Sequence, residues 1–140
     1  MAGSNEIQTA LITRLTAASP GAAVPSASLS VPNYAFTPGS TRWYRATFLP
    51  GESVAAAVGV DAQNRHVGIF QVDIFDPKGQ GDGLSRQEAE RIVSCFKRGT
   101  ILHCTGGSFI IEKAYRAAGT EEGDWYQTPV IIQWRGDVAN

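Results

Sequence analysis

Hydrophobic and polar residues alternate most regularly in the middle of the chain, between residues 66 and 75. One set of alternate positions is mostly apolar: His66, Gly68, Phe70, Val72 and Ile74. The other set mixes apolar and polar side chains: Val67, Ile69, Gln71, Asp73 and Phe75. A period of two is that of a β-strand with one well-buried face. The pattern therefore predicts a strand over 66–75.

A helical period follows a glycine-rich loop at Gly79–Gly83. Ser85 and Glu88 have the spacing of a capping box, in which the serine accepts from a backbone N–H and the glutamate reaches back. The apolar stripe of this segment is Ala89, Ile92, Val93 and Phe96. Lys97 and Arg98 suit the negative end of the helix dipole, and Gly99 ends the pattern. We expect an amphipathic helix over 85–98, folded back onto the sheet.

The N-terminal part of the chain predicts another amphipathic helix, over 5–18. Its apolar positions recur at helical spacing: Ile7, Ala10, Leu11, Ile12 and Leu15. The small, polar, proline-bearing segment 21–31 is typical of a connector, and 32–36 of a short extended piece.

Aromatic and β-branched residues predict strands in the rest of the chain. A strand over 42–49 begins a unit 42–75, in which the ambiguous segment 50–64 is interpreted as an extended hairpin arm. Three further strands over 100–135 form a meander, with Gly106-Gly107 as a tight-turn signal. Pro129 argues for an edge position or a bulge in the last strand. Residues 136–140 are expected to fray.

These elements predict an α+β fold: a mainly antiparallel β-sheet with the N-terminal helix and the second helix packed on one face. No repeat or composition shift divides the chain, so residues 1–140 are expected to form a single domain. At 140 residues the chain can build a core without disulfides or a metal.

Charge and composition exclude several classes of partner. Twelve basic and 13 acidic residues give a net charge of −1, and no basic run occurs. We therefore expect no direct sequence-specific nucleic acid binding. No apolar run spans a bilayer and the N-terminus lacks the order of a signal peptide, so we expect no membrane partner and a protein made in a cytoplasm.

Motifs that carry chemistry are mostly absent. The glycine loop before the helix could cradle an anion, but no lysine follows it and Asp82 would repel phosphate. Cys95, His103 and Cys104 lack the paired spacing of a zinc site. His103 and Cys104 are adjacent on a predicted strand, so their side chains face opposite sides of it. Buried cysteines and solvated turn carboxylates explain these residues better than a catalytic or metal site does. We expect no catalytic residues, no metal and no cofactor.

Asp73 and the aromatic residues point instead to contacts. Asp73 lies in the middle of a predicted strand, where it either pairs with Arg45 or Lys113 or lies on a face covered by another subunit. Aromatic side chains occur on every predicted strand, and two helices on one face of a sheet cannot cover both sets. Because monomers rarely expose large apolar patches, the pattern favours assembly with other copies.

Three stretches together resemble a known family: TRWYRATFLPGE, HVGIFQVDIFDPKGQGDG and GDWYQTPVIIQWRGDV. They are similar to the tail terminator, or tail-completion, proteins of long-tailed bacteriophages and prophages. The matching positions are Phe48-Leu49-Pro50, 68–75 and 123–129. The resemblance covers roughly residues 5–137, and its motifs carry no catalytic signature.

The resemblance implies a structural virion protein of the tail, assembled in the host bacterial cytoplasm. It implies a homo-oligomeric, six-membered ring that caps the tail tube, ends tube polymerisation and presents a surface to the head-completion or connector protein. A neck or head–tail connector subunit is one alternative; a small ligand-binding or enzymatic domain is another. The expected contacts are in the arm, the glycine loop and nearby strands: Val54, Val58, Val60, Arg65, Asp73, Asp76, Lys78, Asp82 and Trp125.

Overall fold

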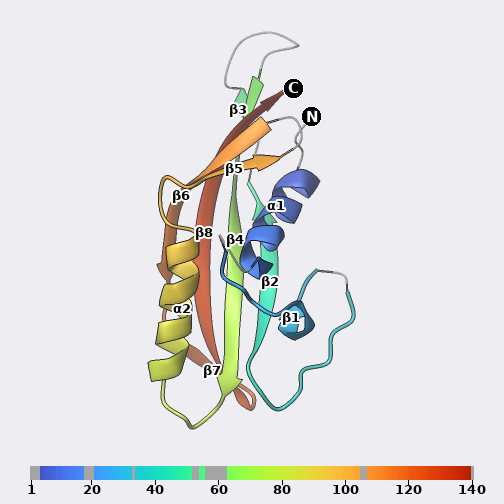
Figure 1. Cartoon of the computed structure of the whole chain (residues 1–140). Helices are drawn as coiled ribbons and strands as arrows, with labels where there is room; N and C mark the ends of the chain where they lie inside the picture. Colours follow the sequence, from blue (N-terminus) through green and yellow to red (C-terminus); the bar gives the residue numbers. More distant parts are fainter. Residues whose placement is uncertain are drawn as a thin grey trace.

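An eight-stranded sheet forms the body of the protein (Figure 1). The computed structural model describes residues 4–17, 21–32, 34–51, 54–55, 63–104 and 107–139. The strands run in the order β1 (Leu29–Ser30), β2 (Trp43–Pro50), β4 (Gln63–Pro77), β8 (Trp125–Ala139), β6 (Gly107–Arg116) and β5 (Ile101–Cys104). Off this path, β3 (Val54–Ala55) pairs with β4 and β7 (Thr120–Glu122) pairs with β8.

The α+β prediction is confirmed. Every strand pair among the described residues is antiparallel except β1 with β2. Two α-helices, α1 (Ser4–Thr16) and α2 (Gly83–Cys95), lie on the same face of the sheet in Figure 1, and the short 3-10 helix η1 (Ser26–Ser28) precedes β1. We call the face that the helices cover the inner face, and the opposite one the outer face.

The inner face and the helices enclose one hydrophobic core. Phe70, Val72 and Ile74 of β4 are fully buried, as the alternation predicts. They pack in one cluster with the apolar stripes of the two helices: Ile7, Leu11 and Leu15 of α1, and Ala89 and Ile92 of α2 with Phe96 just after it. The apolar stripes of the two helices and the inner residues of β4 therefore pack in the same core.

Trp134 of β8 fills the upper part of this core. Its ring lies so close to Gly68 that a Cβ atom on that glycine would come within 2.5 Å of the Trp134 Cζ2 atom. The ring also stacks on Phe48, with centroids 5.8 Å apart, and meets Phe109 edge-on. The glycine in the alternating pattern thus makes room for the largest side chain of the core.

β4 and β8 are longer than predicted and form the spine of the sheet. Each has 15 residues, and they pair from Gln63 opposite Ala139 to Pro77 opposite Trp125. At about 3.4 Å per residue this ribbon is roughly 50 Å long. The prediction that residues 136–140 fray is wrong for 136–139, because β8 is still paired there on both sides: Val138 lies opposite Asn64 and Gly107.

Pro129 lies in a central strand, so its predicted edge position is wrong. β6 ends at Arg116, and the next residue, Ala117, donates its N–H to the Pro129 carbonyl over 2.9 Å. The nitrogen and the carbonyl of one strand residue point to the same side. The missing N–H of Pro129 therefore faces the end of β6, and no bond to β4 is lost. The bulge of this region is in β6, between Ile111 and Lys113.

The segment 21–31 does more than connect. Ala22, Val24 and Leu29 are buried in the core, and β1 pairs in parallel with β2 through Leu29 opposite Tyr44. These three residues stand among serines, alanines and a proline without strand or helix spacing. The sequence pattern therefore did not predict that they are buried. Among the described residues of 32–36, no strand is present.

The two predicted hairpins differ in how much of them is described. β5 and β6 pair antiparallel with Cys104 opposite Gly107, so Gly107 already belongs to a strand. β3 pairs antiparallel with β4 through Val54 opposite Arg65, as an extended arm requires. The rest of the arm, including Val58 and Val60, lies outside the described residues.

Helix α2 begins two residues earlier than predicted and without the capping box. Asp82 is the N-cap and makes no side-chain cap bond. Ser85 donates instead to Asp76, and Glu88 binds side chains of the sheet. The capping-box prediction is wrong because tertiary partners occupy both side chains. The helix ends at Cys95, and Gly99 takes the expected positive φ of 89° four residues later.

Candidate assembly surface

The outer face of the sheet carries apolar side chains that no described helix covers. Leu49 is 47% exposed, Val67 36% and Tyr115 38%, and Ile101 on the edge strand β5 is 56% exposed. The strand register aligns Val67 with Arg135, Ile110 and Ile101 in one row across four strands. This face is thus a mixed surface with apolar members, the type of surface that protein partners bind.

A hollow of about 430 Å³ lies in the upper part of this face. Leu49, Val67 and Ile69 give it apolar walls, with Gly51, Gly68 and Trp134 also in its lining. Glu112 and Gln133 supply the polar part of the rim. An apolar hollow with a few polar groups at its rim is the usual form of a binding site.

The β-bulge in β6 explains the position of Glu112. The register shifts between Ile111 and Lys113, so Glu112 is the additional residue on that strand. A bulge redirects a side chain relative to the alternation of its strand. Gln133 is paired through its backbone with the neighbouring strands, but no described residue forms a hydrogen bond or an ion pair with the side chain of Glu112 or of Gln133. The hollow therefore offers an acceptor carboxylate and an amide.

An aromatic cluster covers the lower end of the outer face. Trp43 stacks on Phe75 with ring centroids 4.1 Å apart and meets Trp125 edge-on at 6.0 Å. Phe36, from the loop that precedes β2, packs on Trp43 at 5.3 Å. Phe75 is only 2% exposed in consequence, although the alternation places it on the face away from the helices.

Asp73 is paired within the chain. It is 1% exposed, and Arg45 on the adjacent strand donates to its carboxylate from Nε at 3.2 Å and Nη2 at 3.1 Å. Gln71 donates to the other oxygen at 2.8 Å. Of the two basic partners predicted from the sequence, Arg45 is therefore the correct one. Lys113 lies over the Tyr115 ring instead, 5.0 Å from its centroid.

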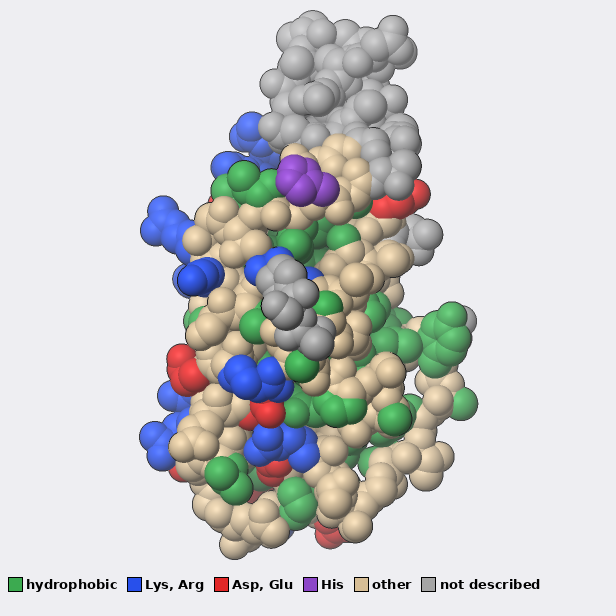
Figure 2. All heavy atoms as spheres, in the orientation of Figure 1, with side chains coloured by type: hydrophobic (Ala, Val, Ile, Leu, Met, Phe, Trp, Pro, Cys, Tyr) green, Lys and Arg blue, Asp and Glu red, His purple; other side chains and the backbone are tan. Residues whose placement is uncertain are grey.

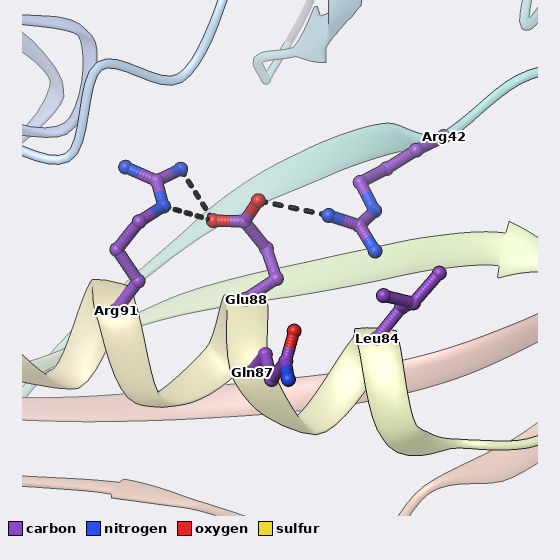
Figure 3. Close-up of a pocket in the computed structure, with 5 residues that line it drawn as sticks. All are labelled: Arg42, Leu84, Gln87, Glu88 and Arg91. Atoms are coloured by element: carbon purple, nitrogen blue, oxygen red, sulfur yellow. Dashed lines mark hydrogen bonds and ion pairs between the residues drawn. The ribbon is translucent and has the colours of Figure 1, made fainter.

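Glu88 of α2 is the centre of a second charge network, which joins the helix to the sheet (Figure 3). Arg42 Nη1 donates to Glu88 Oε2 over 2.8 Å, and the Tyr44 hydroxyl donates to the same oxygen over 3.0 Å. Arg91 Nε donates to Oε1 over 2.6 Å, and its guanidinium also donates to the Ala22 carbonyl. The Glu88 side chain is 11% exposed, so water screens these contacts less than those of a surface pair.

Asp76, at the lower end of β4, extends this network. Arg42 Nε donates to its Oδ1 over 2.6 Å, and Ser85 donates to its Oδ2 over 2.5 Å. Although burial alone would lower the pKa of Arg42, the hydrogen bond and charge of Asp76 raise it. Burial, with the charge and hydrogen bond of Glu88, raises the pKa of Tyr44 to about 12. The network therefore fixes the lower end of the helix against the sheet.

The pocket shown in Figure 3 lies over this network and has a volume of about 210 Å³. Its lining is Arg42, Leu84, Gln87, Glu88 and Arg91. Both arginines already bind Glu88, so the pocket presents a saturated ion-pair network rather than free cations. Figure 2 shows the same mixing of signs over this side of the molecule, where basic and acidic side chains alternate.

The loop between β1 and β2 projects from the edge of the sheet (Figure 1). Residues 31–41 contain no charged side chain, and Tyr34 within them is 76% exposed, the largest value among the exposed large hydrophobic residues. Phe36 on Trp43 and the Arg42 network hold the loop at its return to the sheet. Figure 2 shows hydrophobic side chains on this projecting segment.

The residues predicted as contacts are dispersed over the molecule. Asp73 and Asp76 are buried and paired, so the structure gives them an intramolecular role. Lys78 and Asp82 are exposed on the turn before α2. Lys78 Nζ lies 3.4 Å from Glu121 Oε2, and Arg86 Nε lies 3.4 Å from Asp82 Oδ1. Trp125 belongs to the aromatic cluster.

β3 and the start of β4 lie at the opposite end of the sheet. Arg65 is half-buried in β4 opposite Val54 of β3, and Val58 and Val60 lie outside the described residues. Sequence reasoning missed Tyr34, Glu112 and the hollow. The absence of charge over 31–41 was the one signal that could have indicated the loop.

The described residues offer few groups that could act as nucleophiles or metal ligands. Cys95 and Cys104 are free and half-buried, and burial raises the pKa of the Cys104 thiol. No group of three or more His, Cys, Asp or Glu residues that could hold a metal occurs within the described part of the chain. None of the helices described is long and apolar enough to cross a membrane.

The fold and these surfaces define a class of protein: an α+β domain whose helices cover one sheet face while the other keeps an apolar hollow and a projecting uncharged loop. A family model described as phage tail terminator protein matches residues 6–134. The chain belongs to this family, whose members are structural proteins of phage tails rather than enzymes.

Comparison with solved structures supports the fold. Five solved chains match. One of them matches with a TM-score of 0.74 and 20% sequence identity over 97% of this chain and 96% of its own length. A likeness at this identity establishes the fold alone. No curated protein matches the chain.

Proposed function

We propose that this protein assembles into a homo-oligomeric ring, with six members as the expected number, that caps the phage tail tube. The ring ends tube polymerisation and presents a surface to the head-completion or connector protein. The observation that carries the proposal is the family match over residues 6–134. Membership of the tail terminator family implies that the protein is a component of the virion tail. The ring and the capping of the tube are what we propose beyond that membership.

Two different surface patches of the subunit support a ring. A closed ring of identical subunits needs a heterologous interface, in which different patches of neighbouring copies meet. The uncharged loop projects at the β1 edge, and the apolar hollow lies on the outer face, so the chain carries two different unpaired surfaces. The exposed turn residues Lys78 and Asp82 and the arm with Val54, Val58 and Val60 remain the proposed contacts with the tube or the connector.

The test is electron microscopy of tails assembled with and without the protein, together with its mass in solution. We expect tails of uniform length in its presence and overlong tubes in its absence. The mass should be that of a ring, or that of a monomer which forms a ring once tubes are added. A protein that stays monomeric, binds no tube and leaves tube length unchanged would contradict the proposal. A protein found only at the head side would support the connector alternative.

A further inference from the structure

We propose that Tyr34 of one copy inserts into the outer-face hollow of the next copy, and that this contact is the repeating interface of the assembly. The inference rests on the proposed ring and names the two patches that form it. The insert is the uncharged loop, residues 31–41, and the receptor is the hollow lined by Leu49, Val67, Ile69, Glu112 and Gln133.

The chemistry of the hollow fits a phenol. Its walls are aliphatic, so an aromatic ring removes apolar surface from water on both partners. Its rim holds the unpaired carboxylate of Glu112 and the unpaired amide of Gln133. The Tyr34 backbone N–H donates to the Val31 carbonyl, but its hydroxyl has no partner among the described residues. The hydroxyl is therefore free to donate to the carboxylate, and a hydrogen bond to a charged acceptor is a strong one.

The other exposed apolar side chains fit the hollow less well. Leu84 lines a pocket on the helix side together with Arg42 and Arg91, and Ile101 follows Lys97 and Arg98 closely in the chain. Inserting either of them would bring cationic groups against an apolar wall, at a cost in desolvation. The loop that carries Tyr34 brings no charge.

The loop is also prepared for binding. Phe36 packs on Trp43 with centroids 5.3 Å apart, and Arg42, directly after the loop, is bound by Asp76 and Glu88. A loop held at its base loses less conformational freedom on binding, which favours affinity. Interfaces are depleted of charge at their centre and enriched in tyrosine, and this loop has both properties.

The position of the two patches gives the geometry of assembly. The loop projects beyond the β1 edge of the sheet (Figure 1), whereas the apolar walls of the hollow, Leu49, Val67 and Ile69, belong to the outer face. Insert and receptor are therefore different patches on one subunit. Repetition of such a contact makes a head-to-tail chain, which closes as a ring when the rotation between neighbours completes a full turn. A closed ring is the symmetry that the proposed function requires.

The first test compares two tyrosines. We expect Tyr34→Ala to weaken association by about 30-fold or more, the effect of an interface hot spot. Tyr34→Phe, which keeps the ring but loses the hydroxyl, should weaken it about tenfold. Tyr115→Ala is the matched control, since Tyr115 is exposed on the same outer face but does not line the hollow. Sedimentation of the purified variants, alone or with tubes, measures the change.

The second test is cross-linking in a Cys95→Ala, Cys104→Ala background. Tyr34→Cys combined with Val67→Cys should give a ladder of covalent oligomers under mild oxidation or with a short bismaleimide. Tyr34→Cys combined with Tyr115→Cys should give none. If the wild-type protein is monomeric in solution, the reaction is carried out on assembled tails.

The third test mixes two variants that each lack one patch. Tyr34→Ala keeps an intact hollow, and Val67→Glu keeps an intact insert. Each variant alone should be monomeric, and the equimolar mixture should form dimers with one native junction.

The outcomes separate this inference from the proposed function. Intact rings of Tyr34→Ala, or rings without a Tyr34–Val67 cross-link, would overturn the Tyr34 contact and leave the capping function standing. A wild-type protein that forms no ring and caps no tube would overturn the proposed function, and the interface with it.

Discussion

The inner and outer faces of the sheet are made from alternate residues of the same strands, and they differ in what they pack against. On β4, the inner residues Phe70, Val72 and Ile74 are fully buried under the helices, whereas the outer residue Val67 is 36% exposed. On β2, Ala46 is buried and Leu49 is 47% exposed. The inner face holds the fold together, and the outer face retains apolar surface that folding does not require. Substitutions on the two faces should therefore affect different properties.

The largest effect on stability is expected at Trp134 on the inner face. Trp134→Ala should lower the free energy of unfolding by about 3–5 kcal/mol, because it removes the ring that packs on Gly68, Phe48 and Phe109. Urea unfolding measures the change. Trp134→Phe is the control: the indole N–H has no partner among the described residues, so its loss should cost much less. A loss below about 1 kcal/mol for the alanine variant would show that the inner face is not the core.

A smaller loss is expected at Glu88, where a polar contact fastens the helix to the inner face. Glu88→Ala leaves Arg42 Nη1, Arg91 Nε and the Tyr44 hydroxyl without their acceptor, so the free energy of unfolding should fall by about 2–3 kcal/mol. Glu90→Ala is the matched control on the same helix: its side chain is 65% exposed and lies 3.6 Å from Arg116, and its removal should change stability by less than about 0.5 kcal/mol. Equal effects of the two would mean that the network does not fasten α2.

Alkaline pH tests the same network. The pKa of Tyr44 is raised by burial and by Glu88 to about 12, above the value of about 10 in an unfolded chain. The folded state thus holds the phenol proton of Tyr44 more tightly than the unfolded state does. The stability that this difference contributes is fully present below about pH 10 and is lost as the pH rises to about 12. The free energy of unfolding should fall by about 1–2 kcal/mol across this window, and Tyr44→Phe should remove that part of the pH dependence. A wild-type protein and a Tyr44→Phe variant with the same alkaline profile would contradict the assignment.

The smallest effect on stability is expected on the outer face. Val67→Ala should change the free energy of unfolding by no more than about 0.5 kcal/mol, because the side chain is already partly in water. The same substitution should weaken assembly, which sedimentation measures. A variant that is clearly less stable but assembles normally would reverse the roles of the two faces.

The strand and helix periods were sufficient to predict most of the fold. Alternation identified the inner face of β4, and the apolar stripes identified both helices, because local spacing determines which side of an element is buried. The pairing of Asp73 with Arg45 was one of three alternatives, beside a pairing with Lys113 and a face covered by another subunit. The buried faces of β4 and of the helices follow from local spacing, whereas the choice between the Asp73 partners depends on which strands lie side by side.

Features that depend on tertiary partners were not predictable in this way. Ser85 and Glu88 have the spacing of a capping box, but Asp76 at the end of β4 binds Ser85, and Arg42, 46 residues earlier in the chain, binds Glu88. Phe75 falls on the outer face by alternation and is nevertheless buried, because Trp43 stacks on it and Phe36 follows. Glu112 lines the hollow from a bulge in β6, and a register shift leaves no pattern in one sequence.

The long pairing of β4 with β8 has a mechanical consequence. Inter-strand hydrogen bonds run across the strands, so a pull along the length of the ribbon strains the rungs together in shear instead of opening them one after another. From Gln63 opposite Ala139 to Pro77 opposite Trp125, the 15 paired positions would share such a load. A subunit built around this ribbon resists stretching along its long axis far better than peeling at its edges.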